Sequence, residues 1–333
     1  MFTPSSDRLK RPPEKTRRLA GFFIILLISG CSTLPPVKLA DSLPSSVELS
    51  QTPFHPQEKH QCGPAALATI LNVRQIGITP DELTPQIYLP ERKGSLQIEL
   101  TATARRHGML AYPLAPDLGD LFREVAAGNP VLVLQNLAFD WWPQWHYAVV
   151  IGYDLELHEV ILRSGREERR KTRFSTFLST WSRSNNWALV ILPPDKIPQT
   201  ARPASYLKAA YDLEATDRPD EARLAYRSAS EHWPTEKRAW LALGNSLFNT
   251  QEYSEAHAAL KMALSLDPTD TTTWNNLAYV YLAAGCPEQA QWAIERALSI
   301  SPGESDLLDS QRDVRAKTAE LATIKCSIQQ HAE

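Results

Sequence analysis

The sequence predicts two folded parts, an α+β domain followed by an all-α domain. In the first part, segments of helical character precede short apolar segments rich in β-branched residues. This order is expected where helices and an antiparallel sheet are separated along the chain. In the second part, beyond residue 204, small and aromatic residues recur every 34 residues, which predicts paired helices.

Three helices are expected early in the first part. Residues 80–87 and 96–108 have helical composition, and Gly108 is placed to end the second of these helices. Residues 118–127 are expected to form the third helix, with Asp117 capping its start.

Strands are expected after these helices. The clearest is the apolar run 131–135, whose β-branched residues suit a buried strand. Further strands are predicted at residues 146–153, 159–164 and 187–192. The basic run 166–173 is interpreted as the solvated edge of a hairpin.

Cys62 is the first candidate catalytic residue. It stands in the sequence Gln-Cys-Gly-Pro before an apolar helical segment, and Pro64 suits the first turn of that helix. The dipole at a helix N-terminus stabilises a thiolate, so we expect a lowered pKa for Cys62. A cysteine without such a context is more often a small buried apolar residue.

Two further residues complete the candidate site. His146 opens an expected strand, and an imidazole beside Cys62 would form an ion pair with its thiolate and accept its proton. Gln57 could donate its side-chain amide to an oxyanion, although His60 and Gln61 are polar neighbours that could serve instead. No second His, Cys or carboxylate stands at metal-ligand spacing around His146, so no metal is expected.

Gln57, Cys62-Gly63-Pro64 and His146 resemble the bacteriocin-processing, or double-glycine leader, peptidases, a branch of the papain-like cysteine peptidases. The separation of 84 residues between Cys62 and His146 fits this compact branch better than papain itself. The resemblance covers residues 51–194. It implies an α+β papain-like fold in which the cysteine starts a helix, the histidine lies on a sheet and the glutamine helps to form the oxyanion hole.

The chain departs from this family at one position. The family usually has an aspartate on the strand after the histidine strand, where it orients the imidazole. Here the corresponding segment is Arg163-Ser164-Gly165, which has no carboxylate. Ser164 or a backbone carbonyl could accept the imidazole hydrogen bond, and Asp154, the nearest acidic residue, is predicted to lie in a turn. The third catalytic residue is therefore left open.

An aromatic run precedes the histidine. Phe139, Trp141, Trp142 and Trp145 lie within the seven residues before His146. The run could line a substrate cleft or could pack on the domain as a lid, and the sequence favours neither.

The first 30 residues predict a bacterial lipoprotein signal peptide. Six basic residues precede the apolar run 19–28, which is about half as long as a membrane-spanning helix. Ser29-Gly30-Cys31 resembles a lipobox, which implies cleavage before Cys31 and lipid attachment to it. Ser32 in place of an aspartate favours the outer membrane, facing the periplasm, and residues 31–50 are expected to be a flexible tether.

Charge and cysteine content agree with this location. The first 30 residues carry a net charge of +4, so a chain that starts at Cys31 has a net charge of −7 rather than −3. An acidic protein is not expected to bind nucleic acid. Cys286 and Cys326 could form a disulfide in an oxidising periplasm. The chain has no phosphate-binding glycine loop, so we expect no ATP and no other cofactor.

The repeated part follows a linker at residues 195–204. Three sets of positions keep the spacing of 34 residues: Pro234, Pro268 and Pro302; Ala222, Ala256 and Ala290; Tyr206, Trp240 and Trp274. This register resembles the tetratricopeptide repeat, in which small residues let two helices pack closely. We expect three repeats at residues 205–304 and a capping helix with a tail at 305–333. Such a module usually holds a peptide or a partner protein, and the alternative is a spacer.

Taken together, these features predict a lipid-anchored periplasmic cysteine peptidase with a repeat domain that docks a protein substrate or partner. Cys62 would be the nucleophile, His146 the base and Gln57 the oxyanion donor. Two other functions are left open. The same Cys–His pair could transfer an acyl or peptidyl group to an amine, or the missing aspartate could mark an inactive peptidase fold that acts as a scaffold through its repeats.

Overall fold

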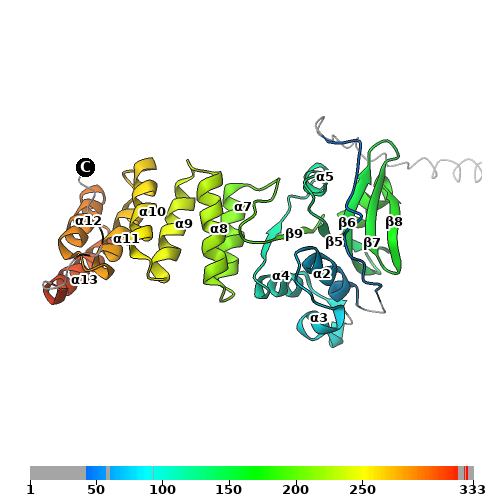
Figure 1. Ribbon diagram of the computed structural model, residues 1–333, viewed down its shortest axis with the longest axis horizontal. Coiled ribbons are helices and arrows are strands. Elements are labelled where there is room, and N and C mark those ends of the chain that lie inside the picture. The colour runs from blue at the N-terminus through cyan, green and yellow to red at the C-terminus, as the bar shows by residue number, and fades with distance from the viewer. Residues whose placement is uncertain (1–42, 58–60, 93, 322–325, 327, 329–333) are drawn as a thin grey trace, which may run out of the picture. The chain divides into compact units, whose positions relative to one another are not determined.

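The structure is a computed structural model, and it describes residues 43–57, 61–92, 94–321, 326 and 328 (Figure 1). The expected signal peptide at 1–30, the lipidation residue Cys31 and most of the expected tether lie outside the described residues. Within the part of the chain that is described, no helix is both long enough and apolar enough to cross a membrane.

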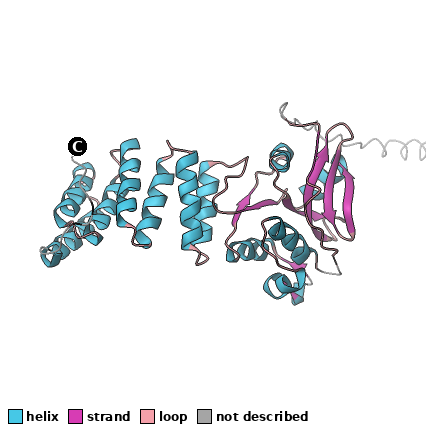
Figure 2. Ribbon diagram, in the orientation of Figure 1, coloured by secondary structure: helices cyan, strands magenta, loops and turns pink. Residues whose placement is uncertain are grey.

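An antiparallel sheet forms the centre of the first part (Figure 2). Its strand order is β4 (Leu110–Pro113), β9 (Ala188–Leu192), β5 (Val131–Asn136), β6 (Trp145–Asp154), β7 (Glu159–Ser164) and β8 (Glu167–Arg173), with β1 (Ser46–Glu48) also paired to β6. The strands expected at 131–135, 146–153, 159–164 and 187–192 are confirmed as β5, β6, β7 and β9. The basic run is confirmed as the mostly exposed edge strand β8.

Helices cover both faces of this sheet. On one face lie α2 (Cys62–Val73), α3 (Pro80–Ile87) and α4 (Gln97–Arg106), and on the other lie α5 (Leu118–Ala126) and α6 (Phe174–Ser182) (Figure 1). β5 is buried along its whole length because alternate residues face the two helical layers: Leu132 and Leu134 pack toward α2, and Val131 and Val133 toward α5. The α+β fold class is thereby confirmed.

Side-chain caps start two of these helices, and the sequence predicts the first of them. The Asp117 side chain caps α5 by accepting a hydrogen bond from the amide of Asp120 at 2.9 Å. A reciprocal capping box between Thr79 and Glu82 starts α3. The helix α6 and the strand β4 were not anticipated. Between α3 and α4 the chain forms β2 (Tyr88–Leu89), a 3₁₀ turn η1 (Pro90–Arg92) and β3 (Gly94–Ser95).

The expected tether at 31–50 is wrong at its C-terminal end. Residues 46–48 form β1, which pairs with β6 beyond the end of β5. Gly152 makes this pairing possible, because a Cβ atom there would lie 2.4 Å from the carbonyl oxygen of Val47. The Glu48 carboxylate also forms an ion pair with Arg169 of β8 at 2.6 Å. These non-local contacts leave no signal in a segment rich in Pro and Ser.

The second part consists of consecutive antiparallel helices. They are α7 (Pro203–Glu214), α8 (Pro219–His232), α9 (Lys237–Asn249), α10 (Tyr253–Leu266), α11 (Thr271–Ala283), α12 (Pro287–Ile300) and α13 (Ser305–Leu321). Ala222, Ala256 and Ala290 are fully buried, as expected for residues at which helices approach closely. The indole N–H groups of Trp240 and Trp274 donate to the carbonyl oxygens of Pro234 and Pro268, both at 2.9 Å. These bonds join the end of one helical pair to the start of the next, so the repeated residues link consecutive units.

A disulfide joins Cys286 to Cys326. Cys286 is fully buried at the start of α12, and Cys326 follows α13. The bond ties the chain beyond the last helix back to the final helical pair. The sequence alone left this pairing open, because geometry decides whether two cysteines can bond.

Candidate active site

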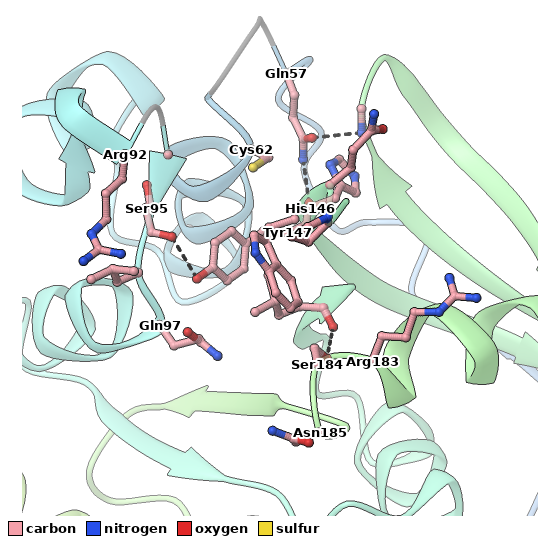
Figure 3. Close-up of a pocket in the computed structure, with 17 residues that line it drawn as sticks. Gln57, Cys62, Arg92, Ser95, Gln97, His146, Tyr147, Arg183, Ser184 and Asn185 are labelled. Carbon is pink, nitrogen blue, oxygen red and sulfur yellow. Dashed lines mark hydrogen bonds between the residues drawn. The ribbon is translucent and has the colours of Figure 1, made fainter. Parts of the chain in front are cut away.

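Gln57, Cys62 and His146 line the same cleft, which has a volume of about 730 Å³ (Figure 3). They come from three separate segments: the loop before α2, the first residue of α2 and the start of β6. The other lining residues come from residues 92 and 94–97, from the β5–β6 segment, from Gly165 after β7 and from residues 183–185. The fold thus brings together the three residues that the sequence singles out.

The residue after Cys62 explains how the nucleophile candidate reaches the cleft wall. A Cβ atom on Gly63 would lie 2.6 Å from Ser95 Oγ and 2.7 Å from Ser95 Cβ. Glycine therefore lets the first turn of α2 pack directly against β3. Any larger side chain would push Cys62 away from the opposite wall, where residues 94–97 line the cleft.

The expected lowering of the Cys62 pKa is wrong. Burial raises the pKa of the Cys62 thiol, and the backbone amides of Tyr147, Gly63 and Cys62 itself oppose this effect only in part. The helix N-terminus does present amide N–H groups to the sulfur, as the sequence predicts. The cost of removing a thiolate from water outweighs their attraction.

The His146 imidazole is neutral at neutral pH. Burial, with a smaller contribution from the charge of Arg170, lowers the pKa of His146 to about 4. Its Nε2 lies 2.9 Å from Ser164 Oγ on β7. Among the described residues, no hydrogen bond joins His146 to the Cys62 thiol. The expected thiolate–imidazolium pair is therefore not the resting state of the site.

Ser164 occupies the place where the resembled family has an aspartate, and it contacts the imidazole as one of the sequence alternatives proposed. Asp154 is the last residue of β6 rather than a turn residue, and its carboxylate accepts hydrogen bonds from the amides of Glu156 and Leu157 in the turn that follows. The neighbours of Ser164 also organise the site. Arg163 donates to the carbonyl oxygens of Ser50 and Thr52 and so holds the loop that carries Gln57.

Gln57 is held in place by several hydrogen bonds. Its Nε2 donates to the Tyr147 carbonyl at 3.3 Å, and its Oε1 accepts from the Gly165 amide at 3.1 Å (Figure 3). The backbone N–H of Gln57 also donates to the backbone carbonyl oxygen of Gly165, at 2.9 Å. Among the hydrogen bonds of the described residues, the second Nε2–H of Gln57 has no partner. Of the two alternatives, Gln61 is the N-cap of α2 and does not line the cleft, and His60 lies outside the described residues.

The aromatic run does not pack on the domain as a lid. Phe139, Trp141 and Trp142 are 62–78% exposed, whereas Trp145 lines the cleft. Arg183 holds the segment by donating to the carbonyl oxygens of Asn136 and Ala138. The cleft-lining alternative is correct for Trp145.

Sequence reasoning missed the walls of the cleft. Arg92, Gln97, Arg183 and Asn185 line it, but they belong to no motif and lie far from Cys62 and His146 in sequence. Non-local folding alone brings them to the site. The one available signal is indirect: a peptidase needs a cleft around its nucleophile.

This fold, an α+β domain followed by paired helices, is that of a C39-peptidase-like domain joined to a helical repeat domain. Residues 49–189 match the model of the Peptidase_C39 like family, and residues 207–271 and 259–291 match two models described as tetratricopeptide repeat. The chain therefore combines a C39-peptidase-like domain with tetratricopeptide repeats. No curated protein matches it.

Solved structures resemble each part separately. A C39-like peptidase from Bacillus anthracis is 19% identical, with a TM-score of 0.40 over 46% of this chain and 100% of that one. The first tetratricopeptide domain of Spaghetti (RPAP3), solved with an HSP90 peptide, is 16% identical, with a TM-score of 0.33 over 35% of this chain and 93% of that one. MamA is 22% identical, with a TM-score of 0.32 over 36% of this chain and 74% of that one.

Proposed function

We propose that this protein is a cysteine peptidase in which Cys62 attacks a peptide carbonyl, His146 carries the proton and Gln57 binds the oxyanion. The observation that carries the proposal is the convergence of these three side chains on one cleft. Since each comes from a different segment, a purely structural role for any one of them would not bring the other two to the same cavity.

The mechanism starts from a neutral pair. Because Nε2 of His146 contacts Ser164, Nδ1 is the ring nitrogen that can take the thiol proton. The thiol loses its proton to Nδ1 as sulfur attacks, which requires a closer approach than the free protein shows. Catalytic hydrogen bonds often shorten in this way once substrate binds.

The oxyanion is stabilised by groups already in place. The remaining Nε2–H of Gln57 and the backbone amide of Cys62 at the start of α2 are the donors that would bind the oxyanion. Collapse of the tetrahedral intermediate expels the amine, which takes the proton from His146 and leaves a thioester on Cys62. Water then attacks the thioester with His146 as base and regenerates the thiol.

The test is peptide cleavage by the full-length protein, with products identified by mass spectrometry from a mixture of peptides of defined sequence. Cys62→Ala and His146→Ala are expected to lower the cleavage rate by about 10³-fold or more. Ser175→Ala, at an exposed residue of α6 that does not line the cleft, is the control for a similar truncation elsewhere and should cleave at the wild-type rate. Cleavage that persists in Cys62→Ala would rule out this mechanism.

A second candidate function is that of an inactive peptidase fold acting as a scaffold. It is favoured by the raised pKa of Cys62 and by the lack of a carboxylate at position 164. Under this function, Cys62→Ala would leave cellular activity intact, whereas disruption of the repeats would abolish it. Measuring both variants in the same cells separates the two functions.

We further propose that the repeats recruit a protein substrate or partner and that Cys31 anchors the protein to the outer membrane, facing the periplasm. The Cys286–Cys326 disulfide supports an oxidising compartment. The lipobox-like sequence before Cys31 supports lipidation. If Cys31 is lipidated, the wild-type protein should incorporate labelled fatty acid and the Cys31→Ser protein should not. Separation of the inner and outer membranes then shows which of them holds the protein.

A further inference from the structure

The cleft differs in charge from the rest of the protein. Among the described residues that line it, two are arginines, Arg92 and Arg183, and none is an aspartate or a glutamate. The whole chain carries a net charge of −3. A concave wall of one sign concentrates field lines inside the cleft and attracts ligands of the opposite sign.

The charge of Arg183 is not neutralised by its contacts. Its guanidinium donates to the carbonyl oxygens of Asn136 and Ala138 and to Ser179 Oγ, all of which are uncharged acceptors. The nearest carboxylate is that of Asp140, at 3.8 Å, and its side chain is 83% exposed. Such an exposed partner is strongly screened by water, so Arg183 still contributes positive potential to the cleft.

Arg92 is placed to bind a ligand directly. It ends the 3₁₀ turn η1, its side chain is exposed, and in Figure 3 it lies across the cleft from His146 with Cys62 between them. Within the described part of the chain, no hydrogen bond or ion pair occupies its guanidinium. The planar guanidinium binds a carboxylate through two parallel hydrogen bonds.

We propose that the site takes a peptide with an acidic side chain close to the scissile bond, and that Arg92 is the residue that binds this carboxylate. The inference rests on the proposed peptidase function and specifies its substrate class. Arg183 contributes through the potential of the cleft, whereas Arg92 contributes a direct contact. The lining residues Gln97 and Asn185 are uncharged. Their side-chain amides can form hydrogen bonds with the backbone of a bound peptide, and they add no negative charge that would repel its carboxylate.

Peptide binding to the full-length Cys62→Ala protein tests this inference without requiring catalysis. The probe is a library of octapeptides in which one position is fixed as Glu or as Gln and the others are random. Peptides retained on the immobilised protein are identified by mass spectrometry. We expect about tenfold enrichment of Glu over Gln at one position, as for one charge-assisted hydrogen-bonded contact.

Arg92→Gln in the same protein is expected to abolish this enrichment. Arg227→Gln is the matched control, because Arg227 is an exposed arginine of the repeat domain, and it should retain the enrichment. Equal retention of Glu and Gln peptides by Cys62→Ala protein would overturn the inference, as would enrichment that survives Arg92→Gln.

The outcomes also separate this inference from the proposed function. If the wild-type protein does not cleave peptides but the Arg92-dependent enrichment is present, the substrate class stands and the peptidase assignment falls. If it cleaves peptides with no preference for acidic residues, the peptidase assignment stands and the inference is wrong.

Discussion

The cleft and the repeats are stabilised in opposite ways. In the repeats, the residues that matter recur at 34-residue spacing and bond to neighbours a few positions away, as Trp240 does to Pro234 and Trp274 to Pro268. In the cleft, each functional side chain depends on residues about 20 to more than 100 positions away, as Gln57 depends on Gly165 and His146 on Ser164. Local periodic contacts build a scaffold, and non-local polar contacts build a site.

This difference implies that the two regions can be damaged separately. A substitution in the cleft network should affect chemistry more than stability. A change in the repeats should affect local stability and leave the cleft as it is. The predictions below test this separation.

Among variants that keep both Cys62 and His146, the largest effect on the cleavage rate is expected at Gln57. Gln57→Glu keeps an oxygen to accept from the Gly165 amide but removes the Nε2 donor, so the cleavage rate should fall by about 10²–10³-fold. Gln51→Glu, in the exposed part of the same loop, is the control and should cleave at the wild-type rate. Steady-state kinetics decides, and equal rates for the two variants would exclude Gln57 from the oxyanion hole.

Loss of the disulfide should lower the stability of the repeat domain and leave that of the peptidase-like domain unchanged. Cys326→Ser opens a bond that spans 40 residues, which is expected to lower the free energy of unfolding of the last helical pair by about 4 kcal/mol. Hydrogen exchange should show loss of protection in α11 and α12 but not in α2. If α2 loses protection to the same extent, the two regions unfold together and the comparison fails.

Stability should depend on pH through His146. The folded protein binds a proton at His146 only below about pH 4, whereas the unfolded chain binds one near the ordinary value of 6.5. The unfolded state therefore binds more protons between these values, so stability is lost as pH falls through this window, by on the order of 3 kcal/mol.

Urea unfolding at pH 7 and pH 4 measures this loss. In His146→Gln, the difference in free energy of unfolding between pH 7 and pH 4 should be smaller than in wild type by on the order of 3 kcal/mol. His158→Gln, at an exposed histidine, should leave the difference as in wild type. An unchanged difference in His146→Gln would show that the imidazole is not buried in its neutral form.

The smallest effect is expected at Ser164. Ser164→Ala removes one hydrogen bond to the imidazole, so the cleavage rate should fall about tenfold. Ser164→Asp places a carboxylate beside the imidazole, and its rate should exceed that of wild type. A lower rate in Ser164→Asp than in Ser164→Ala would show that Ser164 does not orient His146.

Much of this architecture could be predicted from the sequence because its signals are local. Asp117 caps α5 and the alanines of the repeats are buried, as their spacing indicates. Cys62 and His146 could be paired because the motif around each is distinctive. Arg92 and Arg183 could not be found, since only the folded sheet and its helices bring them to the cleft.

Two of the predictions that are wrong share a physical reason. The tether was extended over residues 46–48, although pairing with β6 makes them a strand. The pKa of Cys62 was expected to fall, although burial raises it. Both outcomes depend on the folded protein, in one case on the pairing of β1 with β6 and in the other on the burial of Cys62. The sequence shows where a helix starts and what composition surrounds it, but it shows neither of these contacts.

The proposed mechanism starts from a neutral Cys62–His146 pair, and the pH dependence of Cys62 alkylation shows whether the free protein has one. Full-length protein is treated with a small alkylating reagent across a range of pH, and the modified residues are identified by mass spectrometry. We expect Cys62 to react only at high pH, with a midpoint above the ordinary value of 9.0, and we expect His146→Ala to leave this midpoint unchanged. Selective alkylation of Cys62 near pH ~6 that disappears in His146→Ala would contradict this expectation, because only a thiolate–imidazolium pair reacts in that way.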